Sequence, residues 1–179
     1  RQAIDLQESF TQAMRHHVEG RLPEAANIYQ HILQSYPSHP VALHLLGVIS
    51  HQVGKSEIAI DLITRALANQ PDYFKAHNNL GNVLRDLGKQ EEALASYQRA
   101  LAIKPNYAEA LSNLGNILKE LGRLDESVAS YRQAITLKPD YVDAHNNLGN
   151  ALKELGDLKG AIGCYRKALV IQWIAKIVM

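Results

Sequence analysis

The chain has 179 residues, of which 46% are apolar and 21% charged, so it can bury a core and is too apolar for a disordered segment. Nineteen basic and eighteen acidic side chains leave a net charge of +1, which argues against a nucleic-acid partner because phosphate binding needs a basic stripe. The single cysteine excludes a disulfide framework and a thiolate metal cage, and it fits a reducing compartment such as the cytoplasm.

Four series of residues recur at intervals of 34 along the chain, with Ile63 replacing one tyrosine. They are Pro37, Pro71, Pro105 and Pro139; Gly20, Gly54, Gly88, Gly122 and Gly156; Gly47, Gly81, Gly115 and Gly149; and Tyr29, Tyr97, Tyr131 and Tyr165. A fixed period of this length is typical of a repeat protein. In chain order we predict a leader over 1–5, repeats over 6–39, 40–73, 74–107, 108–141 and 142–170, and an atypical apolar helical extension over 171–179.

Each repeat has the pattern of two helices, most clearly the third repeat. A first helix is predicted from about Phe74 to Leu87, ended by Gly88. A second helix is predicted from about Gln90 to Ile103, because the following proline cannot continue it. Asn106 and Glu109 have the spacing of a capping box that opens the next repeat.

Small residues mark the places where the two helices of a repeat meet. Gly81, Gly115 and Gly149, opposed by Ala93 or Ala161, let the helices approach closely. One hairpin cannot bury its own apolar face, so neighbouring hairpins must stack. The predicted fold class is therefore all-α, an α-solenoid of five helix-turn-helix repeats.

The recurring residues resemble the tetratricopeptide repeat family over almost the whole chain. The third repeat carries the resemblance on Leu80-Gly81, Ala93, Tyr97, Ala100 and Pro105. The first repeat is the loosest match, with Gln12-Ala13 in place of Leu-Gly. The resemblance implies a right-handed superhelix whose first helices line a concave groove. It also implies a scaffold that binds an extended peptide or protein segment.

Three runs are also similar to the repeats that precede protein O-GlcNAc transferase catalytic domains and to those of many bacterial proteins: NNLGNVLRDLG, SNLGNILKELG and NNLGNALKELG. This similarity leads to a second hypothesis, a substrate-recruiting region of a larger enzyme whose catalytic domain lies outside this sequence. The chain itself has no GxSxG, P-loop or dinucleotide motif, so we expect neither catalysis nor a cofactor from it.

Asparagines occupy matching positions on the predicted first helices of the last three repeats. We name this set the amide ladder: Asn79, Asn82, Asn113, Asn116, Asn147 and Asn150. Helical periodicity turns them away from the apolar stripe, and an amide can pair with both the C=O and the N–H of a peptide backbone. We therefore predict a peptide-binding site that also includes Lys75, Asn78 and Asn146. The alternative is that duplication copied a solvated face three times.

The matching positions of the first two repeats carry an apolar patch: Phe10, Met14, Leu45 and Val48. Either these side chains contact the core or preceding repeats, or they form a hydrophobic subsite for a partner. Some tetratricopeptide domains clamp a C-terminal carboxylate with basic residues along the groove. Lys75 has no basic counterpart at Glu109 or Asp143, which argues against that mode.

The eight histidines and the cysteine show no pattern of a metal or catalytic site. His16 and His17 are adjacent and diverge on a helix, and no HExxH motif occurs. His44 and His51 are seven residues apart and could share a helix face, but no carboxylate motif accompanies them. Cys164 is expected to be a small packing residue. We expect no bound metal.

The end of the chain departs from the repeat, because an apolar helical stripe replaces the expected proline and polar turn. The predicted self-association residues are Val170, Trp173, Ile174 and Ile177. The simplest explanation is a truncated or vector-derived end. The other hypothesis is a homo-oligomer, in which the stripe contacts its twin or the apolar patch of a neighbour.

Two further expectations concern a membrane partner and the parent polypeptide. The apolar stretch at its end is too short to span a bilayer, so we expect no membrane partner. The sequence begins at Arg1 without a signal-like segment, so we expect it to be part of a longer polypeptide.

Overall fold

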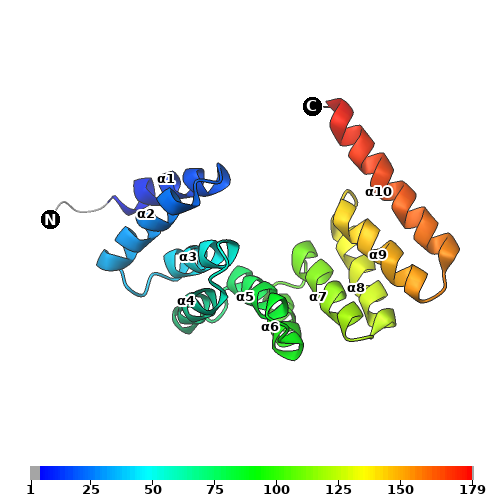
Figure 1. Ribbon diagram of the computed structural model, residues 1–179, viewed down its shortest axis with the longest axis horizontal. Coiled ribbons are helices and arrows are strands. Elements are labelled where there is room, and N and C mark those ends of the chain that lie inside the picture. Colours follow the sequence, from blue (N-terminus) through cyan, green and yellow to red (C-terminus); the bar gives the residue numbers. More distant parts are fainter. Residues whose placement is uncertain (1–4, 179) are drawn as a thin grey trace. The chain divides into compact units, whose positions relative to one another are not determined.

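The computed structural model describes residues 5–178, and over this range the chain forms ten helices and no strand (Figure 1). The helices are α1 (Leu6–Val18), α2 (Leu22–Ser35), α3 (Pro40–Gln52), α4 (Ser56–Asn69), α5 (Phe74–Asp86), α6 (Gln90–Ile103), α7 (Ala108–Glu120), α8 (Leu124–Leu137), α9 (Val142–Glu154) and α10 (Leu158–Val178). The odd-numbered helices are the predicted first helices, and the even-numbered ones are the second helices. The prediction of an all-α fold is confirmed.

The chain divides into two compact units, one ending at Leu87 and the other beginning at Gly88. In unit 1, α1 pairs with α2 and α3 with α4, and each pair packs on the next first helix. In unit 2, α7 pairs with α8 and α9 with α10, while α6 packs on α7 and α8 on α9. The boundary between the units falls inside the third sequence repeat, between α5 and α6.

Glycines end the first helices, whereas the predicted capping box does not form. Gly88 has a φ of +75°, a conformation that permits the chain to leave α5 at low cost. Tyr107 takes the N-cap position of α7, and no side chain caps this helix, so the predicted box of Asn106 and Glu109 is wrong. Helix α9 begins in the same way after Tyr141, whose ring packs into a core cluster. Tertiary packing of the tyrosine therefore prevails over local capping.

The two helices of a hairpin meet at a glycine, as predicted, but the principal opposing group in unit 2 is aromatic. A Cβ atom on Gly115 would lie 2.6 Å from Cε1 of the fully buried Tyr131, and one on Gly149 would lie 2.5 Å from Cε1 of Tyr165. Ser127, at the register of the predicted Ala93 and Ala161, donates a hydrogen bond to the Gly115 carbonyl at 2.7 Å. The glycines therefore make room for a tyrosine ring as well as for a small residue.

Candidate functional site

In unit 2 the amide ladder is anchored by tyrosines from the second helices. The Tyr131 hydroxyl donates to Oδ1 of Asn116 at 2.6 Å, and the Tyr165 hydroxyl donates to Oδ1 of Asn150 at 2.8 Å. Each tyrosine follows its asparagine by 15 residues along the chain, so the two side chains come from the two helices of one hairpin. Because the tyrosine holds the amide oxygen, the NH₂ group of each asparagine is directed away from that bond.

A further hydrogen bond joins the amides of successive first helices. Nδ2 of Asn147 on α9 donates to Oδ1 of Asn116 on α7 at 3.0 Å. Oδ1 of Asn116 thus receives two donors, and the Asn147 carbonyl oxygen remains available as an acceptor among the described residues. The face formed by α7 and α9 carries fixed donors and acceptors rather than freely rotating amides.

In unit 1 an imidazole takes part in the ladder. Nδ2 of Asn79 donates to Nε2 of the buried His44 at 2.8 Å, and Nδ1 of His44 lies 3.0 Å from the Tyr73 hydroxyl. Burial, with a smaller contribution from the charge of Lys75, lowers the pKa of His44 to about 4. The neutral ring therefore accepts from Asn79 and donates to Tyr73. Sequence reasoning considered this histidine only as a metal ligand.

The remaining predicted peptide-binding residues differ in accessibility. Asn78 is only 4% exposed, so its position does not favour direct contact with a peptide. Asn82, Asn113 and Asn146 are half-buried, and Lys75 is exposed. Asn82 and Asn113 have further interactions within the protein.

Polar pairs near the C-terminal ends of the first helices also connect neighbouring repeats. Nε2 of His17 lies 3.2 Å from Oε1 of Gln52, and Nε2 of His51 lies 3.0 Å from Oδ2 of Asp86. Nζ of Lys119 lies 3.6 Å from Oε1 of Glu154. The two partners are 35 residues apart in every pair, as His44 and Asn79 are. Sequence reasoning missed these pairs, although a search for complementary residues one repeat plus one position apart would have found them.

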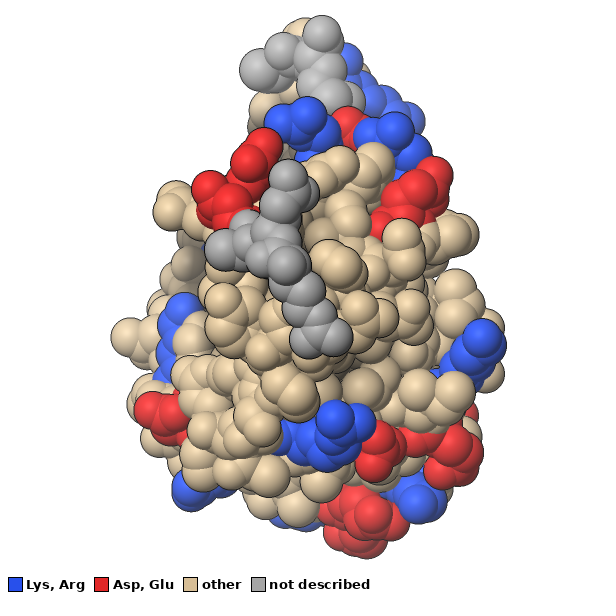
Figure 2. Space-filling view, turned by 90° about the vertical axis from the view of Figure 1, so that its left-hand side faces the viewer, with Lys and Arg blue, Asp and Glu red and all other residues tan. Residues whose placement is uncertain are grey.

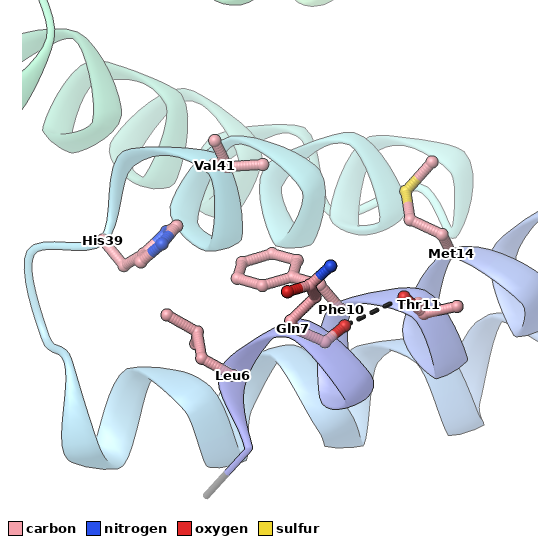
Figure 3. Close-up of a pocket in the computed structure, with 7 residues that line it drawn as sticks. All are labelled: Leu6, Gln7, Phe10, Thr11, Met14, His39 and Val41. Carbon is pink, nitrogen blue, oxygen red and sulfur yellow. Dashed lines mark hydrogen bonds between the residues drawn. The ribbon is translucent and has the colours of Figure 1, made fainter.

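Unit 1 has an open pocket between α1 and α3, with a volume of about 680 Å³ (Figure 3). Its lining is Leu6, Gln7, Phe10, Thr11, Met14, His39 and Val41. The ring centroids of Phe10 and His39 lie 4.9 Å apart. The Met14 sulfur accepts a hydrogen bond from the Tyr29 hydroxyl at 3.3 Å. The pocket is mainly apolar and is lined from two successive first helices.

Two of the four predicted patch residues, Phe10 and Met14, line this pocket, whereas Leu45 and Val48 are half-buried residues of α3 outside its lining. The 34-residue count also corrects one assignment, since Thr11 rather than Phe10 stands at the register of Asn79. Phe10 stands at the register of His44 and packs partly against the core. Leu6, His39 and Val41 were missed because the pocket depends on the spacing between α1 and α3.

Other residues considered at the sequence level lie apart from these faces. Cys164 is half-buried on α10, where burial raises its pKa and Arg132 acts in the opposite direction. Such a thiol is a weak nucleophile. Within residues 5–178, no three histidine, cysteine or acidic side chains gather to hold a metal ion, and no helix is long and apolar enough to cross a bilayer.

In Figure 2, Lys and Arg side chains lie among Asp and Glu side chains, and the coloured residues form no continuous stripe of one sign on the face shown. The predicted self-association residues of α10, Val170, Trp173, Ile174 and Ile177, are all exposed.

Comparison with known families agrees with the 34-residue period. Models described as TPR repeat match residues 81–122 and 115–156, and models described as tetratricopeptide repeat match residues 62–95 and 142–172. No curated protein sequence matches the chain. The similarity to transferase repeats finds no support in these matches.

Solved structures share the fold. A crystal structure of MamA has a TM-score of 0.80 at 22% identity, covering 97% of this chain and 98% of that one. A MamA fragment from Desulfovibrio magneticus RS-1 gives 0.79 at 21% identity, with 93% and 94% covered. PilF of Pseudomonas aeruginosa gives 0.84 at 17% identity, with 91% and 74% covered. The repeat matches and the helical hairpins together show that this chain belongs to the tetratricopeptide repeat family.

Proposed function

We propose that the chain is a non-enzymatic protein-interaction scaffold that binds an extended segment of another protein along the first helices of unit 2. The observation that carries the proposal is the tyrosine anchoring of Asn116 and Asn150. Anchoring orients the amide NH₂ groups before a ligand arrives, which lowers the entropy lost on binding. A copied solvated face would not need a tyrosine of the second helix to orient it.

The chemistry of this face suits a peptide backbone. The NH₂ groups of Asn116 and Asn150 can donate to peptide carbonyls, and the Asn147 carbonyl can accept from a peptide N–H. Neighbouring helices lie about 10 Å apart and an extended chain advances about 3.3 Å per residue, so one ladder position meets roughly every third peptide residue. Such contacts read the backbone rather than the side chains, so many sequences should bind.

The apolar pocket of unit 1 supports a second kind of contact. Its lining from Leu6, Phe10 and Met14 suits an apolar side chain of a ligand. Such a contact selects for an aliphatic or aromatic side chain, because that group gains free energy by leaving water.

The experiment replaces Asn116 and Asn150 with aspartate. Each aspartate keeps the oxygen that accepts from tyrosine but loses the NH₂ donor, so the fold is retained while the proposed contact disappears. Peptides are first selected from a phage-displayed random library on the wild-type chain, and their affinities are then measured by calorimetry. We expect the double variant to bind at least about tenfold more weakly, as the loss of two hydrogen bonds requires.

The matched control is Asn27→Asp, the same change at an exposed position of the second helix α2. It should bind the selected peptides as the wild type does. Equal affinities for the wild type and the double variant would refute the role of the amides. The simple triple substitution of Asn79, Asn113 and Asn147 by alanine is less informative, because Asn79 and Asn147 bond neighbouring helices and their loss lowers stability.

A further inference from the structure

The last helix of unit 2 exposes apolar side chains, and two of them, Ile162 and Leu169, stand at positions that are buried or half-buried in α6 and α8. We name this set the outer α10 face: Leu158, Ile162, Leu169, Val170, Trp173, Ile174 and Ile177, each between 49% and 65% exposed. Beyond Ala168 the helix is apolar on nearly every side, a composition typical of a buried helix.

The repeat register shows what normally covers this face. Helices α2, α4, α6 and α8 each pack against the first helix that follows them. Leu33, Leu67, Leu101 and Ile135 are half-buried in these contacts, whereas Leu169 at the same register is 64% exposed. Leu94 and Val128 are buried, whereas Ile162 at their register is exposed. The outer α10 face is therefore shaped to receive another helix.

The first helix of a second copy is a poor candidate for this position. In α3 the residues buried in the core with α2 include Leu43, Leu46 and Ile49. The residues of α1 at the same register are Ser9, Gln12 and Arg15. Stacking α1 on α10 would bury these polar groups against an apolar surface, which is unfavourable without hydrogen-bond partners. These positions of α1 are polar, whereas the outer α10 face is apolar.

We infer that the outer α10 face is a two-fold interface, in which α10 of a second copy packs on this face much as first helices pack on α2, α4, α6 and α8. Helix α10 is the described element that offers a second copy a matching apolar stripe. A two-fold contact brings the same patch of both copies together and closes a dimer. Seven large side chains at half to two-thirds exposure approach the roughly 800 Å² per partner that a stable interface buries.

The charges on α10 give the interface a specific salt dependence. All charged residues of the helix are basic: Lys159, Arg166, Lys167 and Lys176. Two α10 helices side by side repel each other electrostatically, and added salt screens this repulsion. The dimer should therefore tighten with salt, whereas attachment to an anionic lipid surface would weaken.

The first experiment measures the oligomeric state by sedimentation over a concentration series at low and high salt. We expect a dimer that tightens with salt. The variant Leu169→Gln with Trp173→Gln should weaken it more than about tenfold. The control Val53→Gln with Ile58→Gln alters two apolar residues of similar exposure in unit 1 and should leave the dimer unchanged. A monomeric wild type, or a dimer that the α10 variant forms as well as the wild type, would overturn the inference.

The second experiment tests the symmetry. In a Cys164→Ser background, Leu169→Cys lies near the middle of the face and should form a disulfide with its own counterpart under mild oxidation, whereas Val53→Cys should not. Open-ended assemblies without this cross-link would indicate a head-to-tail contact and contradict a two-fold interface. Co-sedimentation of a monomeric chain with phosphatidylserine-containing vesicles, lost at high salt, would contradict it in favour of a lipid surface.

Discussion

The first helices of the two units have the same backbone register but different chemistry. In unit 2 the face of α7 and α9 is built from amides that Tyr131 and Tyr165 of the second helices orient. In unit 1 the corresponding face combines an apolar pocket with a neutral histidine. The comparison teaches that the repeat fixes where a side chain projects, while the residue at each position decides whether that face reads a backbone or accepts an apolar group.

The largest expected difference between the units is their response to acid. His44 has a folded pKa of about 4 and an unfolded value near 6.5, so the unfolded chain binds the proton more readily. Titration of His44 leaves the free energy of unfolding unchanged above about pH 6.5. It lowers this free energy as the pH drops from 6.5 to 4, and lowers it no further below pH 4. The total loss is about 3 kcal/mol.

Hydrogen exchange should show this loss in α3 and α5 of unit 1. His44→Asn, which installs the residue found at the same register in α9, should remove this part of the pH dependence. If the variant and the wild type lose equal stability between pH 6.5 and 4, the neutral histidine is not the cause.

The next effect compares the glycines inside two hairpins. Gly115→Ala would press a Cβ against three atoms of the fully buried Tyr131 ring, at 2.6 to 2.8 Å. Gly47→Ala would meet Cγ1 of the aliphatic Ile63 at 2.7 Å. The new methyl group would meet three close atoms of Tyr131 but only one close atom of Ile63, so we expect a loss of about 2–3 kcal/mol at Gly115 and about 1–2 kcal/mol at Gly47. Chemical denaturation measures both, and a larger loss at Gly47 would reverse the comparison.

A smaller effect separates the buried tyrosines. Tyr131→Phe removes a donor to Asn116 and should lower the free energy of unfolding by about 1 kcal/mol. Tyr29→Phe removes only a bond to the Met14 sulfur, a weak acceptor, and should cost less than about 0.5 kcal/mol. Equal losses would mean that the hydroxyl of Tyr131 does not act through the amide.

The smallest effect concerns the exposed pair of Lys119 and Glu154. Its atoms are partly exposed and 3.6 Å apart, so Lys119→Met should change stability by less than about 0.5 kcal/mol, and less at high salt. A loss above 1 kcal/mol in urea denaturation would show that the pairs between first helices contribute more to stacking than this account allows.

The fold is well predicted from the sequence because the 34-residue period repeats the same helix-ending and packing residues along the chain. Gly88 ends α5 and proline follows α6, as the pattern requires. The capping box failed because a tyrosine takes the N-cap position of α7, and its counterparts Tyr73 and Tyr141 pack into core clusters, a contact that no local motif encodes.

The site was less predictable because it depends on contacts across hairpins. Periodicity placed Asn116 and Asn150 on the first helices, but Tyr131 and Tyr165 entered only as recurring residues of the repeat, so their hydroxyl bonds were missed. The role of His44 could not be predicted, because it depends on Tyr73 and Asn79, which follow it by 29 and 35 residues and converge on its ring. The pocket lined by Leu6 and Val41 results from a distance between helices that residue spacing does not give.

The central claim is that the anchored amides of unit 2 donate to a bound peptide backbone. Side-chain amide NMR during titration with a library-selected peptide tests it most directly. The account predicts that the NH₂ signals of Asn116 and Asn150 shift downfield on binding while that of Asn27 stays in place. A peptide that binds and leaves the Asn116 and Asn150 signals unmoved would contradict the claim.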